Sequence, residues 1–486
     1  MSADGPPPGA HCAPSGGVGV VTGTIEPGAI IDGFRLGELI HVGTMALIFR
    51  LQGRDGPLPL IMKIPRLGPG ERSVNVLGFE VCRTVLGALA QSSHHPMLVA
   101  YGDIETTPYL VMEFIDGVAL NHWPKCIPMP PEDVARLGSA MALALNEIHR
   151  QDVIHLDLKP ANVLFRPDGQ AVLIDFGLAH HGHLPDLFAE DLRIPIGNWV
   201  YMAPEQMLGV RCDPRSDIFA LGGMLYQLAT GRLPFGRPAS IAELRRRLYR
   251  DPIPPRTLNP ATPEWLQEII LCCLEVDARR RYPSAHELAA ALSTPAQVEL
   301  TERGARRHRA NLWTVARRRV RAARFVPAPC PPLSMQSSAA PIVAVAIAPW
   351  EGNENLREAL RGATRGAIAA RPGCRIACIT VVPSAATLSG IDDEHSATGR
   401  HIRCLVDLRR WARPLDLPED AITYHVLEAD KPGATLVDYA KTNDIVAILI
   451  GAPLGAGAPW RFAGVGAQVV ATAPCTVTVV RPRAED

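Results

Sequence analysis

Three short blocks of sequence constrain what this chain can fold into more than any other feature does. Residues 153–164 read VIHLDLKPANVL, residues 173–177 read LIDFG, and residues 201–205 read YMAPE. A carboxylate such as that of Asp157 can accept a proton from a hydroxyl, and the ammonium of Lys159 can neutralise nearby negative charge. Asn162 and Asp175 offer the hard oxygen ligands that Mg²⁺ prefers. A turn-capping role would explain each of these residues singly, but it does not explain the set.

The order and spacing of the blocks resemble the HxDLKPxN, DFG and APE motifs of the eukaryotic-type protein kinase family. The resemblance covers roughly residues 32–296 and implies a two-lobed α+β fold that transfers phosphate from ATP to protein Ser/Thr hydroxyls. It implies that Asp157, Lys159 and Asn162 are catalytic, and that Asn162 and Asp175 hold Mg²⁺. Lys159 resembles the serine/threonine subgroup rather than the tyrosine subgroup.

The scarcity of lysine strengthens the case for a second phosphate-binding position. Only five of the 49 basic residues are lysines, and two of them fall where the family uses lysine. Lys63, in residues 60–64 (LIMKI), matches the third-strand lysine that holds the α- and β-phosphates. The planar fork of arginine is not equivalent to a compact ammonium there. We expect Glu80 to be the ion-pair partner of Lys63, with Glu71 as the rival candidate.

The remaining nucleotide contacts follow from the resemblance. The family's GxGxxG loop aligns on residues 41–46, HVGTMA, where only the middle glycine, Gly43, remains. We expect Val42 and Gly43 to contact ATP, although a less glycine-rich backbone approaches phosphates less closely and an ordinary hairpin turn stays possible. Residues 109–115, YLVMEFI, resemble the strand that enters the hinge. This implies that Met112, Glu113 and Ile115 line the adenine site.

Two structural roles also follow from the resemblance. Asp217 is expected to brace the catalytic loop, and Arg281 is expected to pair with Glu205.

The activation segment departs from the pattern of regulated kinases. Leu156 stands where many of them carry an arginine that pairs with a phosphate, and residues 180–200 contain no Ser, Thr or Tyr. We therefore expect activity that does not depend on phosphorylation of this segment. The carboxylates of Glu190 and Asp191 could replace the negative charge of a phosphate on this segment. With Leu156 in place of the arginine, they would need another basic residue as partner. Asn198 replaces the threonine that commonly bridges the catalytic aspartate and lysine.

Patterning divides the chain into four parts: a disordered tail at 1–30, the kinase-like part at 31–296, a basic and Pro/Ser-rich linker at 297–340, and a final part at 341–483. Short apolar runs over 34–64 predict strands. Three- and four-residue spacing of apolar side chains predicts helices at 131–150, 216–231, 263–275 and 284–292. We favour a solvated helix or interdomain linker for the arginine-rich residues 301–325, over a surface for acidic partners.

The final part alternates strand-like runs with helical stretches, which predicts an α/β domain with a parallel sheet and crossover helices. Residues 341–346, 445–451 and 473–481 resemble strands of the universal stress protein family. Members that bind ATP carry an acidic residue where this chain has Ala346. The loop at residues 451–455 keeps glycines, but Ala463–Gly464 lacks the family's later hydroxyl. We therefore favour a regulatory or dimerisation module that binds no nucleotide, with a homodimer through this domain as one possibility.

Composition narrows the possible cellular location and the possible classes of partner. Eleven scattered cysteines with no CxxC pair favour reduced thiols in a cytoplasmic protein over a disulfide framework or a zinc site. No signal peptide and no membrane-spanning run is expected, and zero net charge gives no reason to expect nucleic acid or membrane as a partner. The main alternative is a pseudokinase that senses nucleotide as a scaffold in stress signalling; a small-molecule kinase is the third reading.

Overall fold

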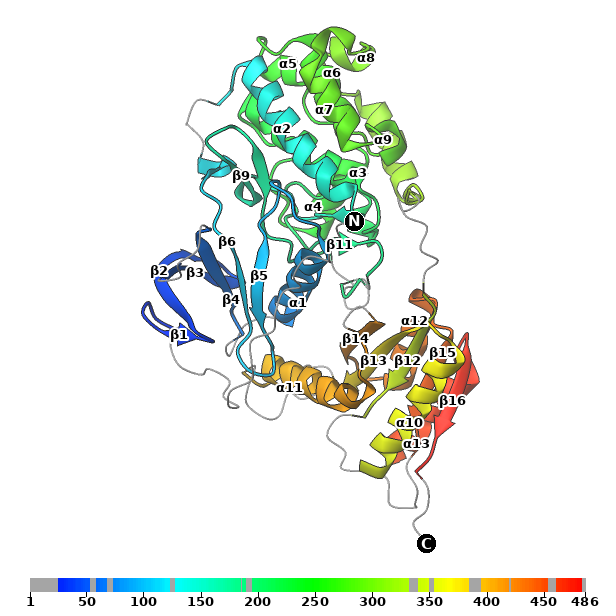
Figure 1. Cartoon of the computed structure of the whole chain (residues 1–486). Coiled ribbons are helices and arrows are strands. Elements are labelled where there is room, and N and C mark those ends of the chain that lie inside the picture. The colour runs from blue at the N-terminus through cyan, green and yellow to red at the C-terminus, as the bar shows by residue number, and fades with distance from the viewer. Residues whose placement is uncertain are drawn as a thin grey trace, which may run out of the picture.

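The computed structural model describes residues 25–52, 58–67, 73–122, 127–184, 186–188, 195–331, 340–348, 354–383, 395–418, 421–452 and 460–482. Several predicted features fall outside these residues: most of the N-terminal tail, Glu71, Glu190, Asp191 and residues 453–455 of the glycine-containing loop. The chain forms two lobes and a third body, which lies below the second lobe and beside the first in Figure 1.

The first lobe is a six-stranded antiparallel sheet in the order β1-β2-β3-β4-β6-β5. Its strands are β1 (Ile30–Ile31), β2 (Phe34–Val42), β3 (Ala46–Gln52), β4 (Leu60–Pro65), β5 (Leu98–Gly102) and β6 (Tyr109–Glu113). Alternate side chains such as Phe34, Leu36, Phe49 and Met62 are buried and form the core of this lobe, as the two-residue period of a strand requires. The helix α1 (Ser73–Ala88) connects β4 to β5.

The second lobe is mainly helical. Its helices are α2 (Pro131–His149), α3 (Arg215–Thr230), α4 (Ile241–Leu244), α5 (Pro255–Leu258), α6 (Glu264–Cys273) and α7 (Ala285–Ser293). Short strands precede and follow the loops that face the first lobe. They are β7 (Val118–Ala119), β8 (Val153–Ile154), β9 (Val163–Phe165), β10 (Ala171–Leu173) and β11 (His180–His181). The predicted helix at 131–150 is confirmed, because its three- and four-residue apolar stripe is fully buried against the lobe.

The arginine-rich segment after residue 297 begins as part of the second lobe. It contains α8 (Glu302–Ala305) and α9 (Leu312–Ala322). Arg303 pairs with Glu268 at 2.8 Å and with Glu275 at 2.9 Å, and the amide of Gln267 donates to the carbonyl oxygen of Arg303. The sequence placed these residues in a linker, but buried polar partners on α6 hold them against the kinase-like part.

The third body is a five-stranded parallel sheet in the order β14-β13-β12-β15-β16. The strands are β12 (Ile342–Ala346), β13 (Arg375–Val382), β14 (Ile422–Glu428), β15 (Ala447–Gly451) and β16 (Thr476–Val480). Helices α10 (Glu354–Ala370) and α11 (His395–Ala412) share a buried cluster with one face of the sheet; α12 (Pro432–Thr442) and α13 (Trp460–Thr472) share a cluster with the other. The predicted α/β architecture is confirmed.

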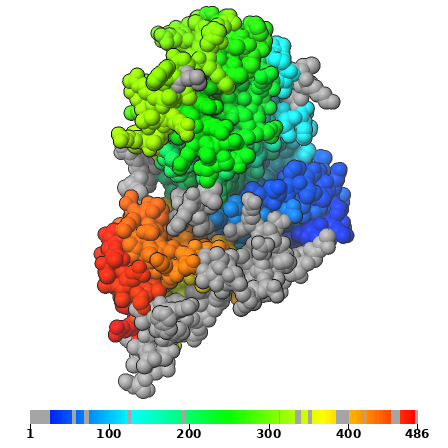
Figure 2. All heavy atoms as spheres, turned by 180° about the vertical axis from the view of Figure 1, so that it is seen from behind, coloured from blue at the N-terminus to red at the C-terminus, as the bar shows by residue number. Residues whose placement is uncertain are grey.

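The third body also touches the first lobe. Helix α11 extends from its own sheet to the outer side of α1 and to the turn between β5 and β6, where its arginines form ion pairs (Figure 1). From behind, the orange part of the chain reaches toward the blue first lobe below the green second lobe (Figure 2). No helix in the described part of the chain is long and apolar enough to cross a bilayer.

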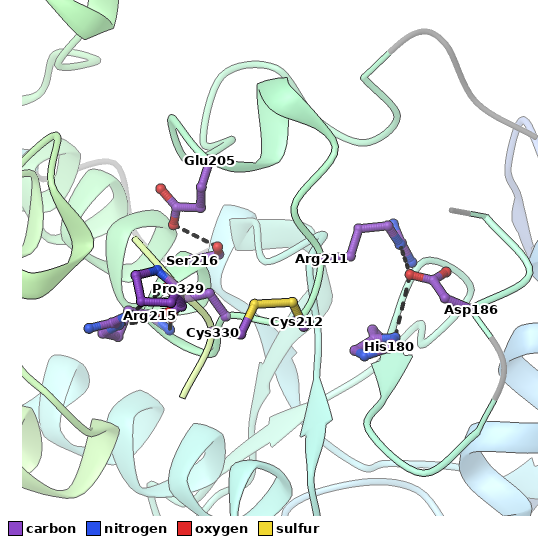
Figure 3. Close-up of a disulfide and its surroundings, with 10 residues drawn as sticks. His180, Asp186, Glu205, Arg211, Cys212, Arg215, Ser216, Pro329 and Cys330 are labelled. Carbon is purple, nitrogen blue, oxygen red and sulfur yellow. Dashed lines mark hydrogen bonds and ion pairs between the residues drawn. A yellow bond between two sulfur atoms is a disulfide. The ribbon is translucent and has the colours of Figure 1, made fainter. Parts of the chain in front are cut away.

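One disulfide joins distant parts of the chain. Cys212, which follows the YMAPE block, is bonded to Cys330 in the segment that leads to the third body, with Cα atoms 5.7 Å apart (Figure 3). The expectation of reduced thiols throughout is therefore wrong for these two residues. Their pairing depends on the path of the linker across the second lobe, which Arg215 also holds through a 3.3 Å hydrogen bond to the carbonyl oxygen of Pro329.

We predict that Cys330→Ser destabilises the second lobe, because the disulfide closes a long loop and restricts the unfolded chain. A loop of this length corresponds to roughly 4–5 kcal/mol in the chain-entropy model, so we expect Tm to fall by roughly 5–10 °C. Thermal unfolding of Cys330→Ser should match that of the reduced wild-type protein. Cys475→Ser, at a half-buried free thiol, is the matched control. A wild-type Tm that does not change when reductant is added would contradict the prediction.

Candidate active site

The predicted catalytic aspartate lies at the centre of a hydrogen-bond network. Asp157 and Asn162 are buried in the loop between β8 and β9. The Asp157 Oδ2 atom accepts from Lys159 Nζ at 2.6 Å and from Asn162 Nδ2 at 3.2 Å. Its Oδ1 atom accepts from the backbone N–H of Asn198 at 3.0 Å. The structure therefore brings Asp157, Lys159 and Asn162 together as the sequence predicts.

A second carboxylate fixes the backbone of this loop. Asp217, at the start of α3, accepts the backbone N–H groups of His155 at 2.8 Å and of Leu156 at 2.9 Å. Leu156 has φ of 61°, a left-handed conformation that costs energy for a branched side chain. The two bonds to Asp217 stabilise that conformation, which confirms the predicted bracing role of Asp217.

The opposite wall of the cleft carries the ion pair of Lys63 and Asp175. Lys63 Nζ lies 2.6 Å from Asp175 Oδ1. The lysine lowers the pKa of Asp175 well below its usual range. Burial works to lower the pKa of Lys63, but the carboxylate of Asp175 outweighs burial and raises it. Both groups are therefore charged at neutral pH, and the structure places the predicted phosphate-binding lysine beside the predicted metal-binding aspartate.

The predicted ion pair between Lys63 and Glu80 is not formed in this structure. Glu80 Oε2 lies 2.6 Å from Arg409 Nη2 on α11 and 3.3 Å from Arg83 Nη2. The α1 residues that line the cleft with Lys63 and Asp175 include Gly78 and Cys82. Because Glu80 is two residues from each of them, about 100° of helix turn per residue puts it on the other side of α1. The resemblance that suggested Glu80 as the partner of Lys63 did not define the rotation of α1.

Cys82 is the residue in this cleft that sequence reasoning missed. It is buried, and burial raises the pKa of its thiol. It lines the same small cavity as Lys63, on the wall where the expected carboxylate is missing. A signal was present in the sequence: Asn75, Gly78 and Cys82 recur at three- and four-residue spacing, which marks one face of a helix.

The side of the cleft that the sequence predicts to contact nucleotide is only partly glycine-lined. Gly43 lies in the turn between β2 and β3, where its N–H donates to the carbonyl oxygen of Ala46 at 2.9 Å. Val42 is exposed at the end of β2. At the hinge, Met112 and Ile115 are buried, and the carboxylate of Glu113 pairs with Arg166 at 2.7 Å. The main chain here has the hairpin and hinge shape that the sequence predicts.

The donor set suits a nucleotide bound with a divalent metal. Asn162 uses its amide nitrogen for bonds to Asp157, so its carbonyl oxygen is the atom suited to a metal. Asp175 supplies a charged carboxylate on the facing wall. Two hard oxygen donors next to two lysines are the groups that a metal–phosphate complex requires.

The activation segment is anchored by charges within the chain. Asp186 Oδ2 accepts from Arg211 Nε at 2.6 Å, and His180 Nδ1 lies 3.4 Å from the same oxygen (Figure 3). Arg211 also donates to the carbonyl oxygen of Leu178 at 3.0 Å. Burial works to raise the pKa of Asp186, but the neighbouring His180 and Arg211 outweigh it and lower the pKa to about 2. Asp186 is thus a permanent anion held by a basic partner.

The platform after the segment has a buried ion pair. Arg281 Nη1 lies 2.6 Å from Glu205 Oε1, which also accepts from Ser216 at 2.7 Å (Figure 3 shows the serine contact). This pair confirms the predicted link between Glu205 and Arg281. Asn198 uses its backbone N–H, rather than its side chain, to hold Asp157; its side-chain oxygen accepts from Val200.

Comparison with known proteins agrees with this cleft. Residues 84–292 match the family model of the protein kinase domain, and residues 342–481 match that of the Universal stress protein family. The chain therefore carries a protein kinase domain followed by a domain of the Universal stress protein family.

Among its relatives is the serine/threonine-protein kinase Pkn1 of Myxococcus xanthus, 34% identical over 276 residues, which are 55% of this chain and 36% of Pkn1. The serine/threonine-protein kinase PknB of Mycobacterium leprae is 32% identical over 274 residues, or 55% of this chain and 43% of that protein. The chain thus spans less than half the length of these curated relatives.

We predict that activity does not require a phosphate on the activation segment. Treatment with a phosphatase should leave the rate of phosphotransfer unchanged, because Asp186 and Arg211 already supply the charge pair. Arg211→Ala should lower the rate and destabilise the protein by about 3 kcal/mol, since it removes the arginine that pairs with the buried carboxylate of Asp186. Arg245→Ala, at an exposed arginine, is the matched control. Loss of activity on phosphatase treatment would show the prediction to be wrong.

Proposed function

We propose that this protein is an ATP-dependent protein serine/threonine kinase, built from a catalytic part at residues 31–296 and a regulatory universal-stress-protein-like part at residues 341–483. The observation that carries the proposal is the set of contacts around Asp157, with the ion pair of Lys63 and Asp175 on the opposite wall of the same cleft. The similarity to bacterial serine/threonine kinases supports the same reaction class.

Each side chain has a defined task in this reaction. Asp157 accepts the proton of the Ser or Thr hydroxyl, and Lys159, held 2.6 Å from it, neutralises negative charge on the transferring group. Lys63 binds the α- and β-phosphates of ATP. Asn162 and Asp175 would hold Mg²⁺, which supplies further charge neutralisation when bound. The hinge residues Met112, Glu113 and Ile115, with Val42 and Gly43 above, would enclose the adenine and the phosphates.

The partners follow from this chemistry. The acceptor is a protein segment with a Ser or Thr hydroxyl, because the Glu205–Arg281 pair stabilises the platform that protein substrates use in this family. The cytoplasm is the proposed location, where ATP is available; among the described residues seven cysteines are free thiols, and the Cys212–Cys330 disulfide is the exception. A homodimer through the third body would use β16, an edge strand of its sheet whose Val479 is exposed.

We expect Asp157→Asn to lower phosphotransfer by about 10²–10⁴-fold while leaving ATP binding nearly intact, because it removes only the proton acceptor. The measurement is transfer of label from γ-labelled ATP, with Mg²⁺, to a generic protein acceptor. Asp168→Asn, at an exposed aspartate in the turn between β9 and β10, is the matched control. Wild-type protein that binds ATP but transfers no label to any acceptor would favour the pseudokinase instead.

A further inference from the structure

The helix α9, on the flank of the second lobe in Figure 1, presents one face to solvent. Trp313 and Val320 are 84% and 76% exposed. They are seven residues apart, so about 100° of turn per residue places them almost in line along the helix. Arg317 and Arg321 lie on the same side and are exposed, and the exposed Arg324 follows in the next turn. These five residues form the outer face of α9.

The opposite side of α9 fixes the helix on the second lobe. Arg318 Nη1 lies 2.7 Å from Asp251 Oδ1. The guanidinium of Arg319 lies 6.0 Å from the ring centroid of Tyr249. An isolated helix of this length would be marginal in water, so these contacts help to keep the outer face formed before any partner binds.

The charge around this face is strongly positive, although the chain as a whole has a net charge of zero. Asp251, which packs against α9, is neutralised by Arg318 and by Arg306 at 3.5 Å. Arg245 and Arg250 of the neighbouring segment are exposed. Within the part of the chain that the structure describes, they and the three arginines of the outer face form no ion pair. The outer face therefore attracts anions, which the net charge of the chain conceals.

A surface of this kind fits an anionic lipid bilayer. Indole rings are favoured at the headgroup level of a membrane, because they are apolar with one polar edge. The stems of arginine side chains lie along apolar surface while their guanidinium groups reach lipid phosphates. A basic helix with an apolar stripe lies in the plane of the membrane surface rather than across the bilayer. The outer face of α9 combines these groups on one side of one helix.

Two other anionic partners fit this face less well. A stable protein partner needs about 800 Å² of surface on each side, whereas a helix of 11 residues is only about 16 Å long and 10 Å wide. A nucleic acid would stack its bases on Trp313, but an aliphatic side chain such as Val320 has no aromatic face for stacking. The bilayer is the partner that uses both apolar side chains together with the arginines.

We propose that the outer face of α9 binds the surface of an anionic lipid bilayer. Arg317, Arg321 and Arg324 contact lipid phosphates, and Trp313 and Val320 lie at the boundary between the headgroups and the acyl chains. Binding holds the kinase domain at the membrane as a peripheral protein. The inference does not depend on phosphotransfer, so it and the proposed kinase function can fail separately.

The test is co-sedimentation of the whole chain with vesicles of phosphatidylcholine and phosphatidylglycerol in equal parts, compared with vesicles of phosphatidylcholine alone. Wild-type protein should bind the anionic vesicles, and added salt should weaken this binding. The triple variant Arg317→Gln, Arg321→Gln, Arg324→Gln should lower the affinity by about 100-fold, the effect of three cationic side chains near an anionic surface. Its Tm should equal that of wild type, because the three side chains are exposed.

A matched variant removes the same charge elsewhere. Arg35→Gln, Arg280→Gln and Arg403→Gln replace three exposed arginines outside α9. This variant should bind anionic vesicles as tightly as wild type does. An equal loss of affinity in both triple variants would mean that only net charge matters, and the proposal would be overturned. Wild-type protein that binds neither kind of vesicle, or both equally, would overturn it as well.

The apolar residues distinguish a bilayer from other anionic partners. Val320→Asn should weaken binding to anionic vesicles by about 5-fold and Trp313→Ser by about 10-fold, because each removes apolar surface that the bilayer buries. Single-stranded oligonucleotide and polyglutamate are titrated against the same proteins. If either binds wild type more tightly than the vesicles do, and neither substitution changes vesicle binding, the face belongs to a nucleic acid or an acidic protein and the proposal is wrong.

Discussion

The catalytic cleft depends on one buried carboxylate. Asp217 accepts the N–H groups of His155 and Leu156 and pairs with His149 at 2.9 Å, which connects α2, α3 and the catalytic loop. Burial would raise the pKa of Asp217, but the hydrogen bonds and positive charge around it lower the pKa. It therefore stays ionised and holds Leu156 at φ of 61°. That conformation turns Asp157 toward Lys159 and Asn162, so the geometry around the proposed proton acceptor follows from the position of α3.

Arginine and lysine divide the work in this chain according to their chemistry. Lysines 63 and 159 lie in the cleft, where a compact ammonium meets carboxylates and would meet phosphates. Arginines stabilise the structure around the cleft. Arg281 forms a two-point ion pair with Glu205, and Arg211 links Asp186 to the main chain of the activation segment. The planar guanidinium donates in several directions at once, so one arginine can join a carboxylate to carbonyl groups. The scarcity of lysine made the cleft lysines conspicuous in the sequence.

The sequence predicted those features that are local or repeat with a regular period. The catalytic loop, the buried stripe of α2 and the alternation of strands and helices after residue 341 are of this kind. The orientation of α1 was not predictable, because Val76 and Leu77 on one side and Phe79 and Cys82 on another make the helix apolar all round. Such a helix is covered on both faces, and the second cover, α11, comes more than 300 residues later in the chain. The Cys212–Cys330 disulfide was missed for the same reason, since spacing in sequence does not give the path of a linker.

The two-sided burial of α1 also places one helix in contact with both the cleft and the third body. One face of the helix packs on the cleft, where its backbone approaches Gly177: a Cβ at position 177 would lie 3.3 Å from the carbonyl oxygen of Gly78. The other face packs on α11 through Val76 and Glu80. A rigid helix cannot move on one side alone, so any change in the docking of α11 must alter the wall of the cleft that faces Lys63 and Asp175. By thermodynamic linkage, whatever binds the cleft and favours one position of α1 must change the docking of α11 by the same free energy.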